Sequence, residues 1–142
     1  MPAVPASILT AVATQADGDF AFTAPLMVIG EDAPGTVVIN EVLPAPWGDA
    51  NRDGVTDSQD EFIELFNPGA APVALAGWQL SDLQSDATAG GHFTFSASRY
   101  IGGGERLLLW RKETRLSLDN TADALRLLDA AGAERDTIGW DA

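Results

Sequence analysis

Short runs in which apolar and polar residues alternate follow one another along the chain, separated by Gly, Pro, Asp and Asn. The run EFIELFN (61–67) shows the alternation most clearly. Because successive side chains of a strand point to opposite faces of a sheet, each such run predicts a half-buried β-strand. The predicted strands span residues 36–44, 61–67, 73–75, 77–82, 92–95, 106–112 and 135–140, and residues 124–132 are predicted to form a strand and a turn.

Helical spacing of apolar residues is scarce. The stretches SILTAVATQ (7–15) and TADALRLLDAAG (121–132) are candidates for short helices, but neither is long or well capped. The second reads better as a strand followed by a turn, because Gly132 precedes another alternating run. Strands with turns every eight to twelve residues or so predict an all-β sandwich or barrel.

The first 35 residues differ in character, since they are rich in Ala and contain four prolines. The runs AVAT (11–14) and FAFTA (20–24) flank an Asp-Gly pair at 17–18, which predicts a β-hairpin. We therefore expect residues 1–35 to form a hairpin or linker and residues 36–142 to form the main domain. The hairpin either belongs to a preceding region or packs on the main domain.

The composition suits one globular domain, with 142 residues of which 46% are hydrophobic. The chain carries 21 acidic and 8 basic residues, a formal charge of −13, and Arg52 is the one basic residue before Arg99. This balance repels nucleic acid and anionic membranes and attracts cations. No apolar run approaches the roughly 18–20 residues that cross a bilayer, so we expect no membrane insertion. The absence of cysteine excludes disulfides and thiolate-bound zinc.

The stretch DANRDGVTDSQDE (49–61) is the strongest chemical signal. Counted from Asp49, it has the D-x-[DN]-x-[DN]-G layout of a calcium loop, in which Gly permits a sharp turn and alternate oxygens point to one centre. Hard oxygen ligands suit Ca²⁺ better than Zn²⁺ or Cu²⁺. The predicted Ca²⁺ ligands are the side chains of Asp49, Asn51, Asp53, Asp57 (through a water) and Asp60, with the backbone carbonyl of Val55.

This loop resembles the DxNxDG calcium loops of bacterial dockerins, which also close with Asp where EF-hands usually carry Glu. Glu61 is a neighbouring carboxylate that could replace or assist Asp60. The flanks depart from that pattern, because predicted strands and not helices surround the loop. The simpler interpretation is a solvated acidic loop. If Ca²⁺ binds, the affinity expected of extracellular modules is about 10⁻⁴–10⁻³ M.

From residue 37 onward the chain resembles bacterial lamin-tail domains. The resemblance is carried by VVINEVLP (37–44), EFIELFNPGAAPVALAGWQLSD (61–82), HFTF (92–95), IGGGERLLLW (101–110) and LDNTADALRLLDAAGAERDTIGW (118–140). It implies an immunoglobulin-like β-sandwich, in which Trp78 is a core aromatic after a turn. Glu64 and Asn67 are then expected to hydrogen bond to backbone and turns.

Animal members of that family are protein-binding tails of nuclear intermediate filaments, and bacterial members resemble modules of secreted or surface proteins. The chain has no heptad rod, which argues against a filament role. We therefore expect a non-catalytic module of a larger extracellular or cell-surface protein, with an unidentified protein or glycan partner. We expect a monomer or weak self-association.

Three other readings depend on particular residues. Catalysis would need more than the lone His92, and no nucleophile or phosphate-loop motif is present. A carbohydrate-binding module would need exposed aromatic side chains. Trp78 and Trp110 are expected in the core. Trp47 is expected either to pack under the acidic loop, its more ordinary role, or to be partly exposed. The basic cluster is expected to be a salt-bridged, solvated face or a partner-binding one. It comprises Arg106, Arg111, Lys112 and Arg115.

Overall fold

The computed structural model describes residues 37–83 and 91–141 and, before them, the backbone of four short strands. The predicted turn at 16–18 and linker at 31–35 lie outside the described residues. The strands are β1 (Ile8–Leu9), β2 (Val12–Thr14), β3 (Phe20–Thr23), β4 (Leu26–Met27), β5 (Val38–Leu43), β6 (Phe62–Phe66), β7 (Val73–Ala74), β8 (Gln79–Asp82), β9 (His92–Thr94), β10 (Tyr100–Ile101), β11 (Arg106–Trp110), β12 (Ala122–Leu128) and β13 (Glu134–Asp141). The helical segments are the 3-10 turn η1 (Ser58–Asp60) and the one-turn helix α1 (Arg111–Thr114).

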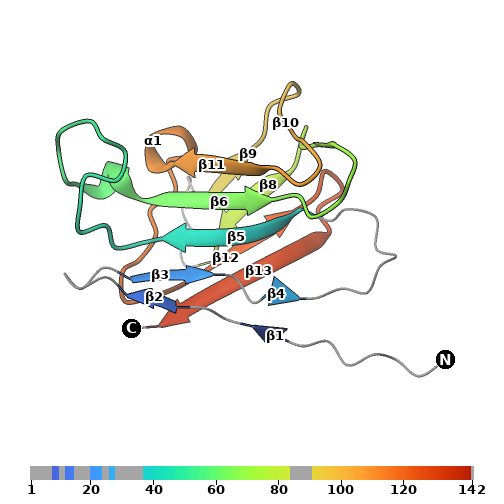
Figure 1. The fold of residues 1–142 in the computed structure, drawn as a ribbon. Coiled ribbons are helices and arrows are strands. Elements are labelled where there is room, and N and C mark those ends of the chain that lie inside the picture. Colours follow the sequence, from blue (N-terminus) through green and yellow to red (C-terminus); the bar gives the residue numbers. More distant parts are fainter. Residues whose placement is uncertain are drawn as a thin grey trace.

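Two antiparallel sheets form the body of the protein (Figure 1). One has the strand order β11-β6-β5-β3-β2 and the other has the order β13-β12-β8-β9. Two smaller ribbons, β10-β7 and β1-β4, accompany them. The architecture is an all-β, immunoglobulin-like β-sandwich, which confirms the fold predicted from the strand pattern.

The predicted N-terminal hairpin forms and extends the first sheet. Strands β2 and β3 pair with each other, and β3 pairs with β5 through Phe22↔Val42 and Thr23↔Glu41. Strands β2 and β3 are thus continuous with the sheet of the main domain. The domain boundary at residue 35 stays a prediction.

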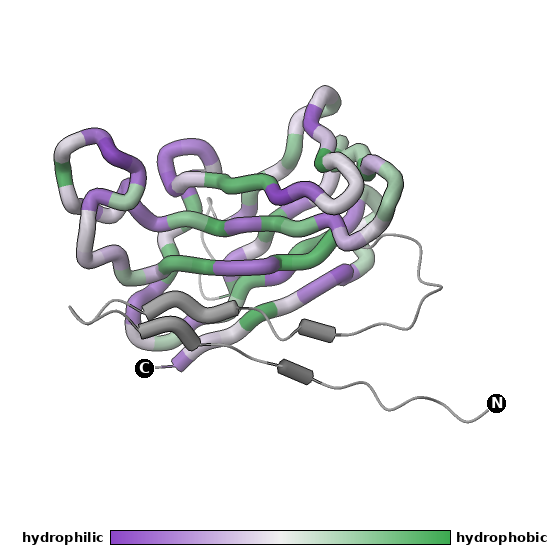
Figure 2. Tube along the Cα trace, in the orientation of Figure 1, coloured by the Kyte–Doolittle hydropathy of each residue, from purple (hydrophilic) through white to green (hydrophobic). Residues whose placement is uncertain are grey.

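The core lies between the two sheets and follows the period-two pattern. Apolar side chains at alternate positions are fully buried, as Ile63 and Leu65 of β6 show, and Figure 2 traces these hydrophobic segments along the central strands. Strand β5 breaks the alternation with a register shift between Ile39 and Glu41. The shift is a β-bulge, and it returns Val42 to the core three residues after Ile39 instead of two.

Residues 122–128 form strand β12, paired on one side with β8 and on the other with β13, which confirms strand over helix for this segment. The strand predicted over residues 106–112 was too long by two residues, because β11 ends at residue 110. The ladder of β11 ends at Trp110 opposite Phe62, and the chain then turns into α1. No helix in the described ranges is long and apolar enough to cross a membrane.

The tryptophans of the sandwich are less uniformly buried than expected. Trp140 of β13 is in the core, and its indole N–H donates to the carbonyl of Asp119 at 2.8 Å. Trp78 and Trp110 were expected in the core but are only half-buried. Trp78 packs against the core from its margin, and Trp110 meets Phe62 edge-to-face on the outer side of the sheet, at 5.6 Å between ring centroids.

Several acidic side chains lie buried or half-buried in the sandwich. The Asp136 carboxylate on β13 accepts the backbone N–H of Ile39 at 2.7 Å, which ties the two sheets together at one edge. Asp82 of β8 and Asp123 of β12 are buried on neighbouring strands of the sheet that contains β13. Burial, and secondarily the charge of Asp82, raises the pKa of Asp123.

Asn67 organises the turns at the end of β6. Its side-chain N–H groups donate to the carbonyls of Ala71 (2.8 Å) and Ile101 (3.2 Å), and its Oδ1 accepts from the backbone of Gly69. The turn at 101–104 approaches so closely that a Cβ on Gly103 would collide with the backbone oxygen of Ala70. The predicted backbone-bonding role of Asn67 is confirmed.

Glu64 has a different role from the one predicted. It accepts from the side chain of Asn40 at 2.6 Å and forms a salt bridge with Arg106 at 3.3 Å. Its partners are therefore neighbouring side chains on the outer face of the sheet.

Replacing Asn67 by Ala should lower the free energy of unfolding by about 2–3 kcal/mol, because buried carbonyls lose their donors. Asn40→Ala is the matched control, and it should cost about 1 kcal/mol or less because Asn40 and its partner Glu64 are half-exposed. Chemical denaturation of the three proteins measures both values. Equal losses for the two variants would contradict the organising role of Asn67.

Candidate functional site

The acidic loop, residues 44–61, connects the adjacent strands β5 and β6. Figures 1 and 2 show it projecting from one end of the sandwich as a largely hydrophilic lobe. It contains all six predicted calcium ligands and ends in the turn η1, which leads into β6.

Asp49 closes the first half of the loop. One carboxylate oxygen accepts the backbone N–H of Asp53 and the other accepts that of Gly54, each at 2.9 Å. The sharp bend requires left-handed backbone conformations, with φ of 93° at Gly54 and 60° at Arg52. Glycine adopts such a conformation without a steric penalty, which explains its place at the sixth position of the loop.

Three further polar side chains each accept an amide two residues ahead. Asn51 accepts from Asp53, Asp53 accepts from Val55, and Asp57 accepts from Gln59. These contacts are of the kind by which short Asx side chains replace backbone bonds in tight turns. The alternate oxygens of the loop therefore face its own backbone amides.

Asp60 fastens the two limbs of the loop together. Its carboxylate is fully buried and accepts the backbone N–H of Asn51 through Oδ1 and of Asp57 through Oδ2, each at 2.9 Å. Asp57 and Asp60 together form a capping box around η1. Asp60 is therefore a structural clasp of the loop.

Glu61 faces away from the loop and towards Arg111, which directly follows β11 at the same end of the sheet. It forms an ion pair with Arg111, and its second oxygen accepts the backbone N–H of Leu118 at 3.1 Å. Burial raises the pKa of Glu61, and the hydrogen bond from Leu118 and the charge of Arg111 partly offset that rise. Its oxygens thus serve α1 and the segment after it, which leaves metal ligation to the loop residues.

The predicted ligands are gathered into one loop, but in the described ranges no three His, Cys, Asp or Glu side chains are arranged to hold one metal ion. Their oxygens accept amide hydrogen bonds instead. Carboxylate oxygens have two acceptor sites each, so an oxygen that accepts one amide keeps a lone pair for a cation. The donor chemistry fits Ca²⁺, and the assignment of a calcium site stays a prediction.

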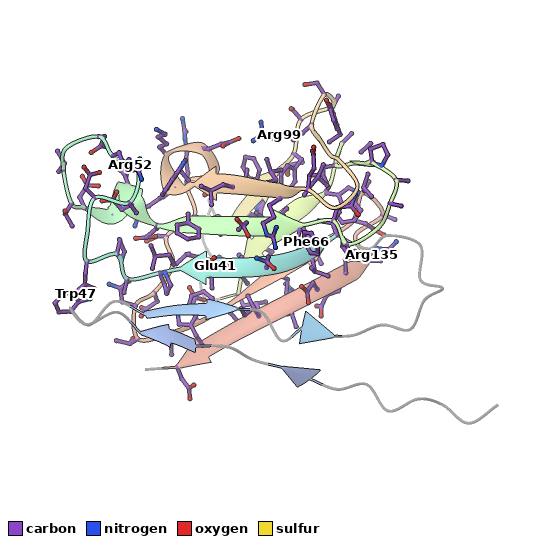
Figure 3. The ribbon with its side chains drawn as sticks, viewed as in Figure 1. Glu41, Trp47, Arg52, Phe66, Arg99 and Arg135 are labelled. Carbon is purple, nitrogen blue, oxygen red and sulfur yellow. The ribbon has the colours of Figure 1, made fainter. Side chains whose placement is uncertain are left out.

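Trp47 lies at the entrance of the loop with 65% of its surface exposed. Figure 3 shows its ring pointing away from the sandwich. The expectation that Trp47 packs under the acidic loop is therefore wrong, and the alternative, exposure, holds. The rigid stretch between Pro44 and Pro46 leads the chain outward before the loop begins.

The remaining candidates are divided between paired and free side chains. Within the described residues, Arg106 pairs with Glu64 and lies over the ring of Phe66, and Arg111 pairs with Glu61. Lys112 and Arg115 are exposed and form no ion pair in this part of the chain. His92 is the exposed first residue of β9.

Comparison with known proteins identifies one relationship. The family described as Lamin Tail Domain matches residues 31–142, most of the chain. No curated protein matches the sequence. The matched region contains both sheets except β2 and β3, and it contains the acidic loop.

Replacing Asp60 by Ala should lower the free energy of unfolding by about 2–4 kcal/mol even in the presence of a chelator, because two amide donors lose a buried acceptor. The matched control is Asp53→Ala, which removes an exposed Asp from the same loop and should cost about 1 kcal/mol or less. Denaturant melts in EDTA measure both. A loss for Asp60→Ala no greater than for Asp53→Ala would contradict the clasp.

Proposed function

The chain belongs to the lamin tail domain family, and on this premise we propose that it is a non-catalytic module that binds a partner or acts as a spacer within a larger extracellular or surface protein. The immunoglobulin-like sandwich and the family support this reading. A rigid sandwich with function placed in its loops and edges is a common design for such modules.

We further propose that the acidic loop holds one Ca²⁺. The observation that carries the proposal is the conformation of the loop: Asp49 accepts the amides of Asp53 and Gly54, with Gly54 at φ 93°. This geometry realises the turn that the D-x-[DN]-x-[DN]-G spacing requires. Asp49, Asn51, Asp53 and Asp60 would supply side-chain oxygens. The carbonyl of Val55 would add another, and Asp57 would act through a water.

A cation would relieve a specific electrostatic cost. The loop places four aspartates within twelve residues, with the one cationic side chain of Arg52 among them. Like charges at this spacing repel each other, and Asp60 is in addition removed from water. Ca²⁺ would offset this repulsion and rigidify the approach to β6. An affinity of about 10⁻⁴–10⁻³ M would suit the calcium concentration outside cells.

Titration of Ca²⁺ into chelator-treated protein should raise its Tm, because the cation binds the folded loop and not the unfolded chain. The rise should be lost in Asp53→Ala and retained in Asp141→Ala, which removes an exposed Asp from the end of β13. Differential scanning calorimetry with Mg²⁺ as the ionic control measures the shift. Equal melting curves in EDTA and in millimolar Ca²⁺ would refute the calcium site.

Carbohydrate binding is the second candidate, and the exposure of Trp47 favours it. An exposed indole ring offers a flat apolar surface against which a sugar ring can stack. In this case the Trp47→Ala variant should lose retention on insoluble polysaccharides and on a glycan array. Wild-type protein that shows no retention on either support would exclude this candidate.

A further inference from the structure

The rims of the two sheets differ in how well they are protected. The edge strands β9 and β2 are short, with three residues each. The edge strand β13 is held to β5 of the other sheet by the hydrogen bond from the Ile39 N–H to Asp136. Strand β11 has five residues, RLLLW, and β6 is its one hydrogen-bonded neighbour in the described chain. Figure 1 shows β11 at the upper rim of its sheet. An apolar edge strand of this kind is a template for pairing with another chain.

The hydrogen bonds at the two ends of β11 show which backbone groups face outward. Asn67 donates to the carbonyl of Glu105, and Arg111 donates to the carbonyl of Glu61. In an antiparallel ladder, pairs that are hydrogen bonded alternate with pairs that are not. Between Glu105 and Arg111, the residues of β11 that are hydrogen bonded to β6 are therefore Leu107 and Leu109. The N–H and C=O groups of the residues between them therefore point towards the open edge. Those residues are Arg106, Leu108 and Trp110.

The same three residues present their side chains on the solvent face of the sheet. Leu107 and Leu109 point into the sandwich, whereas Leu108 is 39% exposed and Trp110 is half-buried beside Phe62. A strand added at this edge would find an apolar surface next to Leu108 and Trp110. It would find a cation next to Arg106.

The charge around this edge is opposite to that of the rest of the protein. Residues 99–115 contain five basic and two acidic side chains, a net charge of +3, whereas the rest contains three basic and nineteen acidic, a net charge of −16. Lys112 and Arg115 follow directly after β11, and Figure 3 shows Arg99 on the same side of the sheet. Arg99, Arg106 and Arg111 already pair with Glu113, Glu64 and Glu61. Among the described residues of this segment, Lys112 and Arg115 are therefore the exposed cations left to attract an acidic segment.

We propose that the open edge of β11 binds an extended acidic peptide of a partner protein as an additional strand. Backbone bonds to Arg106, Leu108 and Trp110 supply the affinity. Alternate side chains of the added strand point to opposite faces, so its acidic side chains lie on the outer face with Arg106 and its apolar side chains lie on the inner face beside half-buried Leu107. A second copy of the chain is disfavoured as the occupant. Two molecules that each carry −13 repel each other, whereas a short peptide carries only a few charges.

The inference rests on the proposed partner-binding role and not on calcium. Its probe is a synthetic eight-residue peptide of alternating glutamate and valine, titrated into the 15N-labelled full chain in EDTA and again in millimolar Ca²⁺. The same affinity is expected in both, so failure of the calcium site leaves this result unchanged. Binding should slow hydrogen exchange at the amides of Arg106, Leu108 and Trp110, because these amides acquire acceptors, while Leu107 and Leu109 are already protected.

Two altered peptides test the two parts of the proposal. A peptide with lysine in place of glutamate should bind about tenfold more weakly or not at all, since it meets a basic rim. A glutamate–valine peptide with N-methyl groups on alternate residues should not bind, because one of its hydrogen-bonding edges is blocked. Equal binding of either altered peptide would overturn the proposal.

The chain offers a matched pair for the charge test. Arg115 and Arg52 are both exposed and both have φ of 60°, but only Arg115 is near β11. Arg115→Glu should weaken binding about five- to tenfold, and Arg52→Glu should leave it unchanged. Leu108→Pro removes an outward N–H without breaking the ladder to β6 and should abolish binding. Equal effects of the two arginine variants would overturn the proposal, as would a dimer seen by sedimentation and lost in Leu108→Pro.

Discussion

Two consecutive buried carboxylates, Asp60 and Glu61, join the acidic loop, the start of β6 and helix α1 at one end of the sandwich. Asp60 turns towards the acidic loop and accepts amides from both of its limbs, and Glu61 turns to the opposite side and binds Arg111 and the amide of Leu118. Removing two adjacent charges from water is costly unless each is fully hydrogen bonded. Their joint satisfaction therefore fixes the path of the loop, the start of β6 and the position of α1 relative to each other.

This junction also separates the two charged regions of the molecule. On one side lies the acidic loop with Asp49, Asp53 and Asp57, and on the other lies the basic rim that begins at β11 and α1. The regions contact each other through η1 and α1, so they form adjoining parts of one end of the sandwich. Under the two proposals, the loop would bind a cation and the rim would bind an acidic partner on the same scaffold.

The fold was predictable because its signal is local. Period-two alternation identified β6, β8, β9 and β13, and Gly132 distinguished β12 from a helix. The misses have long-range causes. The contact of Glu61 with Arg111 joins residues fifty positions apart. No sequence signal near Arg111 predicts the helical turn α1, which positions the Arg111 side chain. Likewise, the spacing of the acidic loop identified its oxygens but did not show that they accept backbone N–H groups. The burial expected for Trp47 was wrong, because the exposure of this side chain depends on the direction in which the loop leaves the sheet.

We propose above all that the clasped backbone of the acidic loop positions oxygens for one Ca²⁺. X-ray diffraction from crystals grown in millimolar Ca²⁺, with anomalous data collected to locate the ion, tests it most directly. If Ca²⁺ is bound, a single anomalous peak is expected inside the loop. The peak should lie about 2.3–2.6 Å from the side-chain oxygens of Asp49, Asn51, Asp53 and Asp60 and from the carbonyl oxygen of Val55. A loop without an anomalous peak, in which the aspartate oxygens contact only amides and water, would contradict it.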